Sequence, residues 1–142
     1  MRILIILTFS LFISILAIGQ EKDLDEWTVG FNCGISSKPT KLVEKMSGLV
    51  RAKKYNEIAF FLKAENTGER YLSIIILERL SDNGLYTLTE LQKMIILRMK
   101  SSMAIVSNCS GCFVDTHSME EMFRENNFIG EKDWLDKMIP TK

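Results

Sequence analysis

The sequence has few of the residues from which catalytic and metal sites are usually built. Its 142 residues include one histidine, three cysteines and two prolines. It contains no G-x-S-x-G, H-E-x-x-H or P-loop motif, and no glycine-rich dinucleotide fingerprint. No motif therefore indicates an enzyme of those classes, and we expect a protein without catalytic activity and without a cofactor.

A surplus of charge of either sign is absent as well. The full chain carries 18 Lys and Arg against 18 Asp and Glu, a formal net charge of zero. Without the first nineteen residues, which include Arg2, the basic residues number 17 (18 − 1) and the net charge is −1 (17 − 18). A nucleic-acid-binding protein usually carries a net positive charge, and this chain does not. We therefore expect no nucleic-acid partner.

The longest hydrophobic run lies at the N-terminus. Arg2 supplies a positive charge, residues 3–16 are almost entirely apolar, and Ala17-Ile18-Gly19 places small residues at the spacing of a signal-peptidase site. This layout predicts a secretory signal peptide over residues 1–19. The alternative is an uncleaved anchor helix, for which the run is at the short end. We expect a single exported domain over residues 20–142, periplasmic or secreted, with no stable membrane insertion after cleavage.

The most apolar stretch of the remaining chain is ERYLSIIILERL, from Glu69 to Leu80. Apolar side chains cover nearly every direction of its helical wheel, and a helix of that kind belongs in a core. The triplet Ile74-Ile75-Ile76 would also suit a buried β-strand, but no partner strand of matching length is visible. We therefore predict a central helix. The stretches Tyr55–Ala64 and Leu88–Met99 also have helical periodicity, and we expect them to pack on either side of it.

These stretches predict a mainly all-α fold: a small helical bundle, or a short right-handed stack of helix pairs. Thr87 and Glu90 have the spacing of a capping box, so the helix after the central one is expected to start there. The two helices then form an antiparallel hairpin over roughly residues 69–101. An irregular strap precedes the helices and a cysteine-containing turn follows them. Alternating apolar residues in the strap indicate a short strand or an extended segment, and these are Trp27, Val29, Phe31 and Cys33.

Residues 39–101 form a succession of helical segments with short breaks. The most characteristic positions are Leu62, the break Asn66-Thr67-Gly68, Arg70-Tyr71-Leu72 and Leu77-Glu78-Arg79-Leu80. In this spacing the segment resembles the helix-pair units of the HEAT and armadillo class of α-solenoids. The resemblance implies a scaffold that presents a surface to another protein, and it identifies no catalytic residue.

The strongest candidate for chemistry is Cys109-Ser110-Gly111-Cys112. An exported protein favours disulfides, so we expect Cys33 to pair with either Cys109 or Cys112, leaving one thiol unpaired. The alternative is a zinc site, because Cys33, Cys109, Cys112 and His117 together make a known structural zinc set. A thioredoxin-like redox role is the least favoured, since Phe113-Val114-Asp115 is a poor helix start.

Basic residues gather in one part of the chain. Residues 38–54 hold six Lys and Arg against Glu44 alone, whereas residues 115–136 hold seven Asp and Glu against two basic residues. The basic side chains could dock an acidic partner, anionic head groups, or the acidic segment of the same chain. An ordinary polar surface is the simpler alternative. The candidate basic face consists of Lys41, Lys45, Lys53 and Lys54.

Two functions are favoured at this point, ahead of a third, an enzyme built on carboxylates, which would show as a deep pocket lined by buried Asp or Glu. The first is an exported helical scaffold domain that binds another protein and has no catalytic activity. The second is a small thiol or metal-binding protein centred on Cys109, Cys112 and His117.

Overall fold

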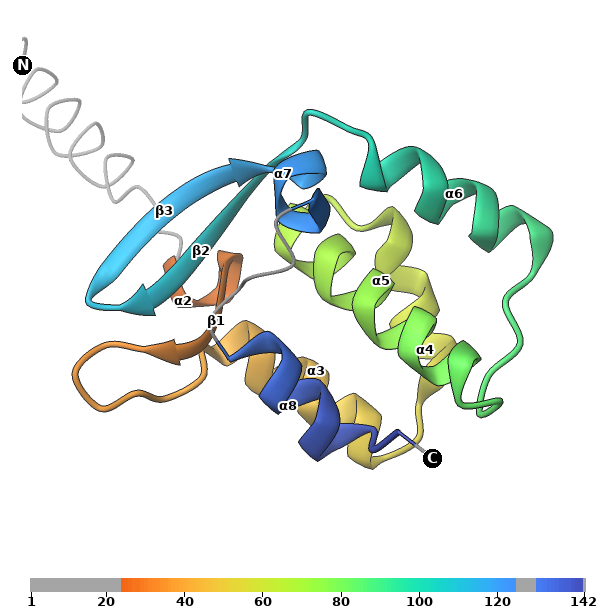
Figure 1. The fold of residues 1–142 in the computed structure, drawn as a ribbon, viewed down its shortest axis with the longest axis horizontal. Coiled ribbons are helices and arrows are strands. Elements are labelled where there is room, and N and C mark those ends of the chain that lie inside the picture. Colours follow the sequence, from red (N-terminus) through yellow and green to blue (C-terminus); the bar gives the residue numbers. More distant parts are fainter. Residues whose placement is uncertain (1–23, 125–129, 142) are drawn as a thin grey trace, which may run out of the picture.

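The computed structural model of the chain describes residues 24–124 and 130–141, and every structural statement below refers to them. The predicted signal peptide over residues 1–19 lies outside this range. In chain order the elements are α2 (Leu24–Trp27), β1 (Thr28–Cys33), α3 (Lys41–Arg51), α4 (Tyr55–Phe60), the 3-10 helix η1 (Phe61–Lys63), α5 (Thr67–Asp82), α6 (Glu90–Lys100), β2 (Ile105–Gly111), β3 (Phe113–Ser118), α7 (Met119–Arg124) and α8 (Glu131–Met138) (Figure 1).

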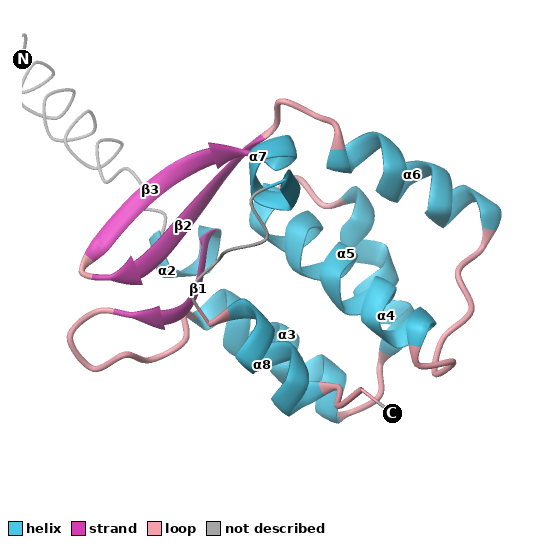
Figure 2. Ribbon diagram, viewed as in Figure 1, coloured by secondary structure: helices cyan, strands magenta, loops and turns pink. Residues whose placement is uncertain are grey.

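The fold is α/β, so the prediction of a mainly all-α bundle or stack of helix pairs is wrong. A three-stranded sheet of order β1-β2-β3 lies at one end of the molecule, beside the helices (Figure 2). Strand β1 pairs with β2 in parallel, and β2 pairs with β3 antiparallel. Within the described residues the helices form no repeated stack of pairs, so a solenoid architecture is not present there.

The hairpin of β2 and β3 replaces the cysteine-containing turn that the sequence predicts. Its pairing runs from Ser110 opposite Phe113 to Ile105 opposite Ser118. Gly111 opens the two-residue turn at a φ of 56°, and glycine is favoured at the first position of one class of tight hairpin turn. The β2 sequence is polar over Ser107–Ser110, yet it is a strand because β1 and β3 pair with its two edges.

Strand β1 confirms the prediction that the N-terminal strap contains a short strand, although Trp27, the first residue of the predicted alternation, lies in α2. Its first four residues, Thr28 to Phe31, are all buried. The hydroxyl of Thr40 donates a hydrogen bond to the Thr28 carbonyl at 2.8 Å, which ties the strand to the start of α3. A Cβ on Gly30 would lie 2.9 Å from Thr40 Cγ2 and 3.2 Å from Cys109 Cβ, so only glycine fits between them.

The predicted central helix is confirmed as α5. Every side chain from Tyr71 to Leu77 is buried. Asn66 caps the helix, because its Oδ1 accepts hydrogen bonds from the N–H groups of Gly68 and Glu69 at 2.9 and 3.3 Å. Helix α5 packs against α3, α4 and η1, as a bundle would require, but also against β1 and β2. The core is therefore shared between helices and sheet.

Helix α6 follows α5 in the chain as predicted, but its main contacts are with α7 and η1 rather than with α5, so the two helices do not form a closely packed hairpin. It also starts two residues later than the expected cap. Thr89, not Thr87, is the cap: its hydroxyl accepts from the N–H of Gln92, and the Gln92 side chain accepts from the N–H of Thr89. Ile96 is the one fully buried side chain of α6. The helix thus covers the body of the protein only partly.

The last helix, α8, lies against α3 and the strap (Figure 1). The Trp134 ring packs on Phe31 with centroids 5.2 Å apart, and its Nε1 donates to Ser47 Oγ at 2.9 Å. Across the described ranges, we find no helix with the length and apolar character needed to cross a bilayer.

Candidate functional site

The cysteines form one disulfide, between Cys33 at the end of β1 and Cys109 in β2. Their Cα atoms are 5.4 Å apart because the two strands are neighbours in the sheet. Cys112, in the exposed turn between β2 and β3, is a free thiol. Of the two pairings that the sequence left open, the structure has Cys33–Cys109. A disulfide is typical of proteins in an oxidising compartment.

The four residues of the alternative zinc set do not form a common ligand group. The sulfurs of Cys33 and Cys109 are bonded to each other, and zinc binds thiolates. His117 lies on β3, where its Nε2 is 3.6 Å from Asp115 Oδ2. Within the described parts of the chain, no group of three or more His, Cys, Asp and Glu residues is arranged to hold a metal ion.

The four lysines of the predicted basic face line two different hollows. Lys41 and Lys45 stand on the first turns of α3 and line a cleft. Lys53 and Lys54 lie in the turn between α3 and α4, where they line a different hollow. Lys45 Nζ is 2.6 Å from Glu69 Oε1, so part of this charge is neutralised within the chain.

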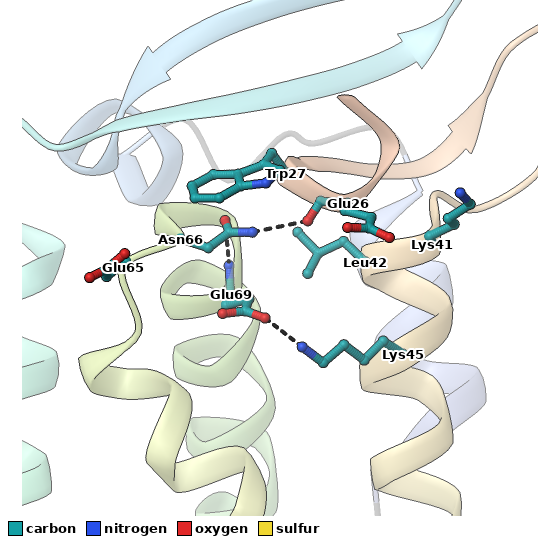
Figure 3. Close-up of a pocket in the computed structure, with 8 residues that line it drawn as sticks. All are labelled: Glu26, Trp27, Lys41, Leu42, Lys45, Glu65, Asn66 and Glu69. Atoms are coloured by element: carbon teal, nitrogen blue, oxygen red, sulfur yellow. Dashed lines mark hydrogen bonds and ion pairs between the residues drawn. The ribbon is translucent and has the colours of Figure 1, made fainter. Parts of the chain in front are cut away.

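The cleft at Lys41 and Lys45 lies between α2, the start of α3 and the start of α5 (Figure 3). Its volume is about 500 Å³. Its lining holds two lysines against three glutamates, a charge of −1 (2 − 3), and most of the Glu69 side chain is covered, with 14% exposed. The lining residues are Glu26, Trp27, Lys41, Leu42, Lys45, Glu65, Asn66 and Glu69.

Internal bonds hold the walls of this cleft together. Asn66, the cap of α5, donates from Nδ2 to the Glu26 carbonyl at 2.9 Å, and Glu69 pairs with Lys45 across the cleft (Figure 3). Asn66, Lys45 and Glu69 therefore already have partners within the chain. These contacts connect α2, α3 and α5. The net charge of the cleft is close to zero, so it gives little electrostatic attraction for a charged ligand.

A second hollow of about 500 Å³ lies between α4 with η1 on one side and α6 on the other. We call it the α4–α6 groove. Phe60 on one wall is 80% exposed and Leu91 on the other is 54% exposed, while Leu62 is buried beneath them. Lys63 is the only charged residue in the lining, which consists of Asn56, Ala59, Phe60, Leu62, Lys63, Tyr86, Thr89, Leu91, Gln92 and Ile95.

The apolar surface continues along α6 beyond the groove. Met94 and Leu97 follow Leu91 on the outer side of the helix, and both are exposed. The sequence predicts that the periodic stretch Leu88–Met99 packs beside the central helix, yet these three side chains are exposed. The missed signal is that apolar residues occupy more directions of α6 than one buried face requires.

Comparison of the chain with models of protein families, with curated proteins and with solved structures finds no match.

Proposed function

We propose that this chain is an exported, non-enzymatic domain that binds an apolar segment of a partner protein in the α4–α6 groove. The observation that carries the proposal is the pair of exposed apolar walls, with Phe60 on α4 and Leu91 on α6. Contiguous exposed apolar surface on a soluble protein marks interaction sites. A groove between two helices suits the apolar face of a third helix.

Export is supported by two independent features. Residues 1–19 have the composition of a secretory signal peptide, and the Cys33–Cys109 disulfide suits an oxidising compartment. The absence of catalytic motifs from the sequence supports a binding role over an enzymatic one.

The test uses a neutral, designed helical peptide as the probe. The peptide spans about 18 residues, or ~27 Å of helix, with leucines at the i, i+3, i+4, i+7 spacing and glutamine elsewhere. It is titrated into the isotope-labelled protein and followed by amide chemical shifts. We expect the shifted amides to gather on α4, η1 and the first turns of α6.

Matched variants decide whether the groove is the site. Phe60→Ser and Leu91→Ser remove exposed side chains, so both should fold normally, and each should raise the dissociation constant about tenfold or more. Ile35→Ser is the control, because Ile35 is 95% exposed and lies in the loop after β1. Peptide shifts centred elsewhere, or equal weakening by Ile35→Ser, would overturn the proposal.

A further inference from the structure

A third hollow adjoins the α4–α6 groove. It has a volume of about 350 Å³ and shares Asn56 and Tyr86 with the groove. We call it the basic hollow, and its lining consists of Lys53, Lys54, Tyr55, Asn56, Glu57 and Tyr86. Because two residues belong to both hollows, a bound segment can pass from one to the other.

The shared wall is held in place by aromatic and polar contacts. The rings of Tyr55 and Tyr86 meet edge to face with centroids 6.3 Å apart. Gln92, in the first turn of α6, donates from Nε2 to the Tyr86 hydroxyl at 3.0 Å. These contacts connect the start of α4 to the start of α6, so both hollows exist before any partner arrives.

The charges along this path are mostly positive. Lys63 lines the groove, and Lys53 and Lys54 line the basic hollow against Glu57 alone, a sum of +2 (3 − 1). Glu57 is paired with Lys54 at 2.9 Å. Lys53 and Lys63 make no ion pair within the part of the chain that the structure describes, and both are exposed.

The backbone holds Lys53 in position. Its φ is 55°, in the left-handed region, and its N–H donates to the Val50 carbonyl at 3.0 Å. The turn after α3 therefore places this lysine at the basic hollow through main-chain geometry, which a side-chain substitution leaves largely unchanged.

We propose that the partner segment is an acidic amphipathic helix. Its apolar side chains occupy the α4–α6 groove, and its carboxylates lie against Lys53 and Lys63. The inference rests on the proposed function, because it specifies the partner of the same groove. Charge complementarity selects the acidic partner, since a basic segment would meet the unpaired ammonium groups of these two lysines.

The experiment compares two peptides on two proteins. The first peptide is the neutral leucine peptide, and the second replaces two glutamines beside its apolar face with glutamates. Both are titrated into the wild-type protein and into the double variant Lys53→Gln/Lys63→Gln at low ionic strength. We expect the acidic peptide to bind wild type about tenfold more tightly than the neutral one. This preference should disappear in the double variant and shrink as salt is added.

The control variant is Lys132→Gln/Lys137→Gln. It removes the same charge from exposed lysines of α8, neither of which lines the groove or the basic hollow. The preference for the acidic peptide should survive in this variant. If it is lost there as well, overall charge rather than this site governs the preference, and the inference fails.

The outcomes separate the inference from the proposed function. Equal binding of both peptides in the groove would leave the proposed function standing and overturn the acidic partner. Binding of neither peptide would overturn both. Anionic lipid vesicles serve as a further probe. If vesicles bind through Lys53 and Lys63 while wild type does not distinguish the peptides, the acidic-helix partner is also overturned.

Discussion

The hydroxyl of Tyr71, in the second turn of the central helix α5, donates a hydrogen bond to the carboxylate of Glu131 at the start of α8. Burial raises the pKa of the Glu131 carboxyl, which the bond from Tyr71 and the nearby Arg79 only partly oppose. Burial, followed by the charge of Glu131, also raises the pKa of the Tyr71 hydroxyl. Together with the ion pair of Arg79 and Asp136 at 2.6 Å, this contact fastens α8 to the core.

This contact predicts a dependence of stability on pH. Because the Glu131 carboxyl has a higher pKa in the folded than in the unfolded chain, folding strengthens its hold on the proton. The raised pKa of Glu131 therefore adds to the free energy of unfolding. This added stability is fully present at pH values below the ordinary pKa of 4.5, and it is lost as pH rises through the raised pKa of the folded state. Glu131→Gln should remove this loss while keeping an acceptor for Tyr71.

The measurement is urea unfolding of wild type and Glu131→Gln at several pH values from about 4 to 7. The stability of the variant relative to wild type should rise with pH across this range. Asp133→Asn, on the exposed side of the same helix, is the control. Parallel pH profiles for wild type and Glu131→Gln would show that the proton affinity of Glu131 does not change on folding.

We predict that removing the disulfide lowers the free energy of unfolding, whereas removing the free cysteine does not. Cys33 and Cys109 are separated by 76 residues, and opening a loop of that length costs about 4 kcal/mol in the chain-entropy model. Cys33→Ser/Cys109→Ser should lower the free energy of unfolding by about this amount, whereas Cys112→Ser should leave it unchanged. Thiol titration of the denatured protein should find one free thiol before reduction and three after it, as the sequence has three cysteines. Three thiols before reduction would contradict the disulfide.

The central helix predicts a contrast between a buried and an exposed substitution. Ile76 is completely buried in α5, and Ile76→Ala should cost about 2–5 kcal/mol through lost burial and the cavity left behind. Leu97 on α6 is 75% exposed, so Leu97→Ala should change stability by less than about 0.5 kcal/mol. Denaturant unfolding with an unchanged m-value measures both. Similar losses for the two variants would mean that α6 is covered in solution.

The start of α6 provides a matched pair of threonines. Thr89→Ala removes the capping hydroxyl and should cost about 1 kcal/mol. Thr87→Ala removes an exposed threonine before the helix and should cost far less. Thermal unfolding of the two variants compares the caps directly. A larger loss for Thr87→Ala would favour the cap that the sequence spacing predicts.

Short capping motifs are ambiguous in the sequence for a physical reason. Thr87 with Glu90 and Thr89 with Gln92 both satisfy the pattern of a capping box. The choice between them depends on where the preceding chain leaves α5 and how Tyr86 packs. Gln92 serves both the cap and the Tyr86 hydroxyl, so the tertiary contact favours the later start.

The sequence alone determined the features that depend on local pattern and composition. Apolar residues in every direction around Ile74-Ile75-Ile76 require burial on all sides, whatever elements provide it. The alternation from Trp27 to Cys33 favours an extended strand, and three cysteines leave at least one unpaired. The first two predictions hold because each depends on side chains that are close in sequence. The third holds because an odd number of cysteines cannot all pair within one chain.

Only the tertiary structure decided the features that depend on distant segments. The polar run Ser107–Ser110 becomes a strand because β1, far earlier in the chain, pairs with one of its edges. The same pairing brings Cys33 to Cys109 rather than Cys112. Likewise, periodicity shows that α6 has apolar side chains, but only packing decides that Ile96 is buried while Leu91 stays exposed beside the groove. Hydrogen-bond partners and burial are properties of the assembled chain, and for this reason the sheet and the groove could not be predicted from the sequence.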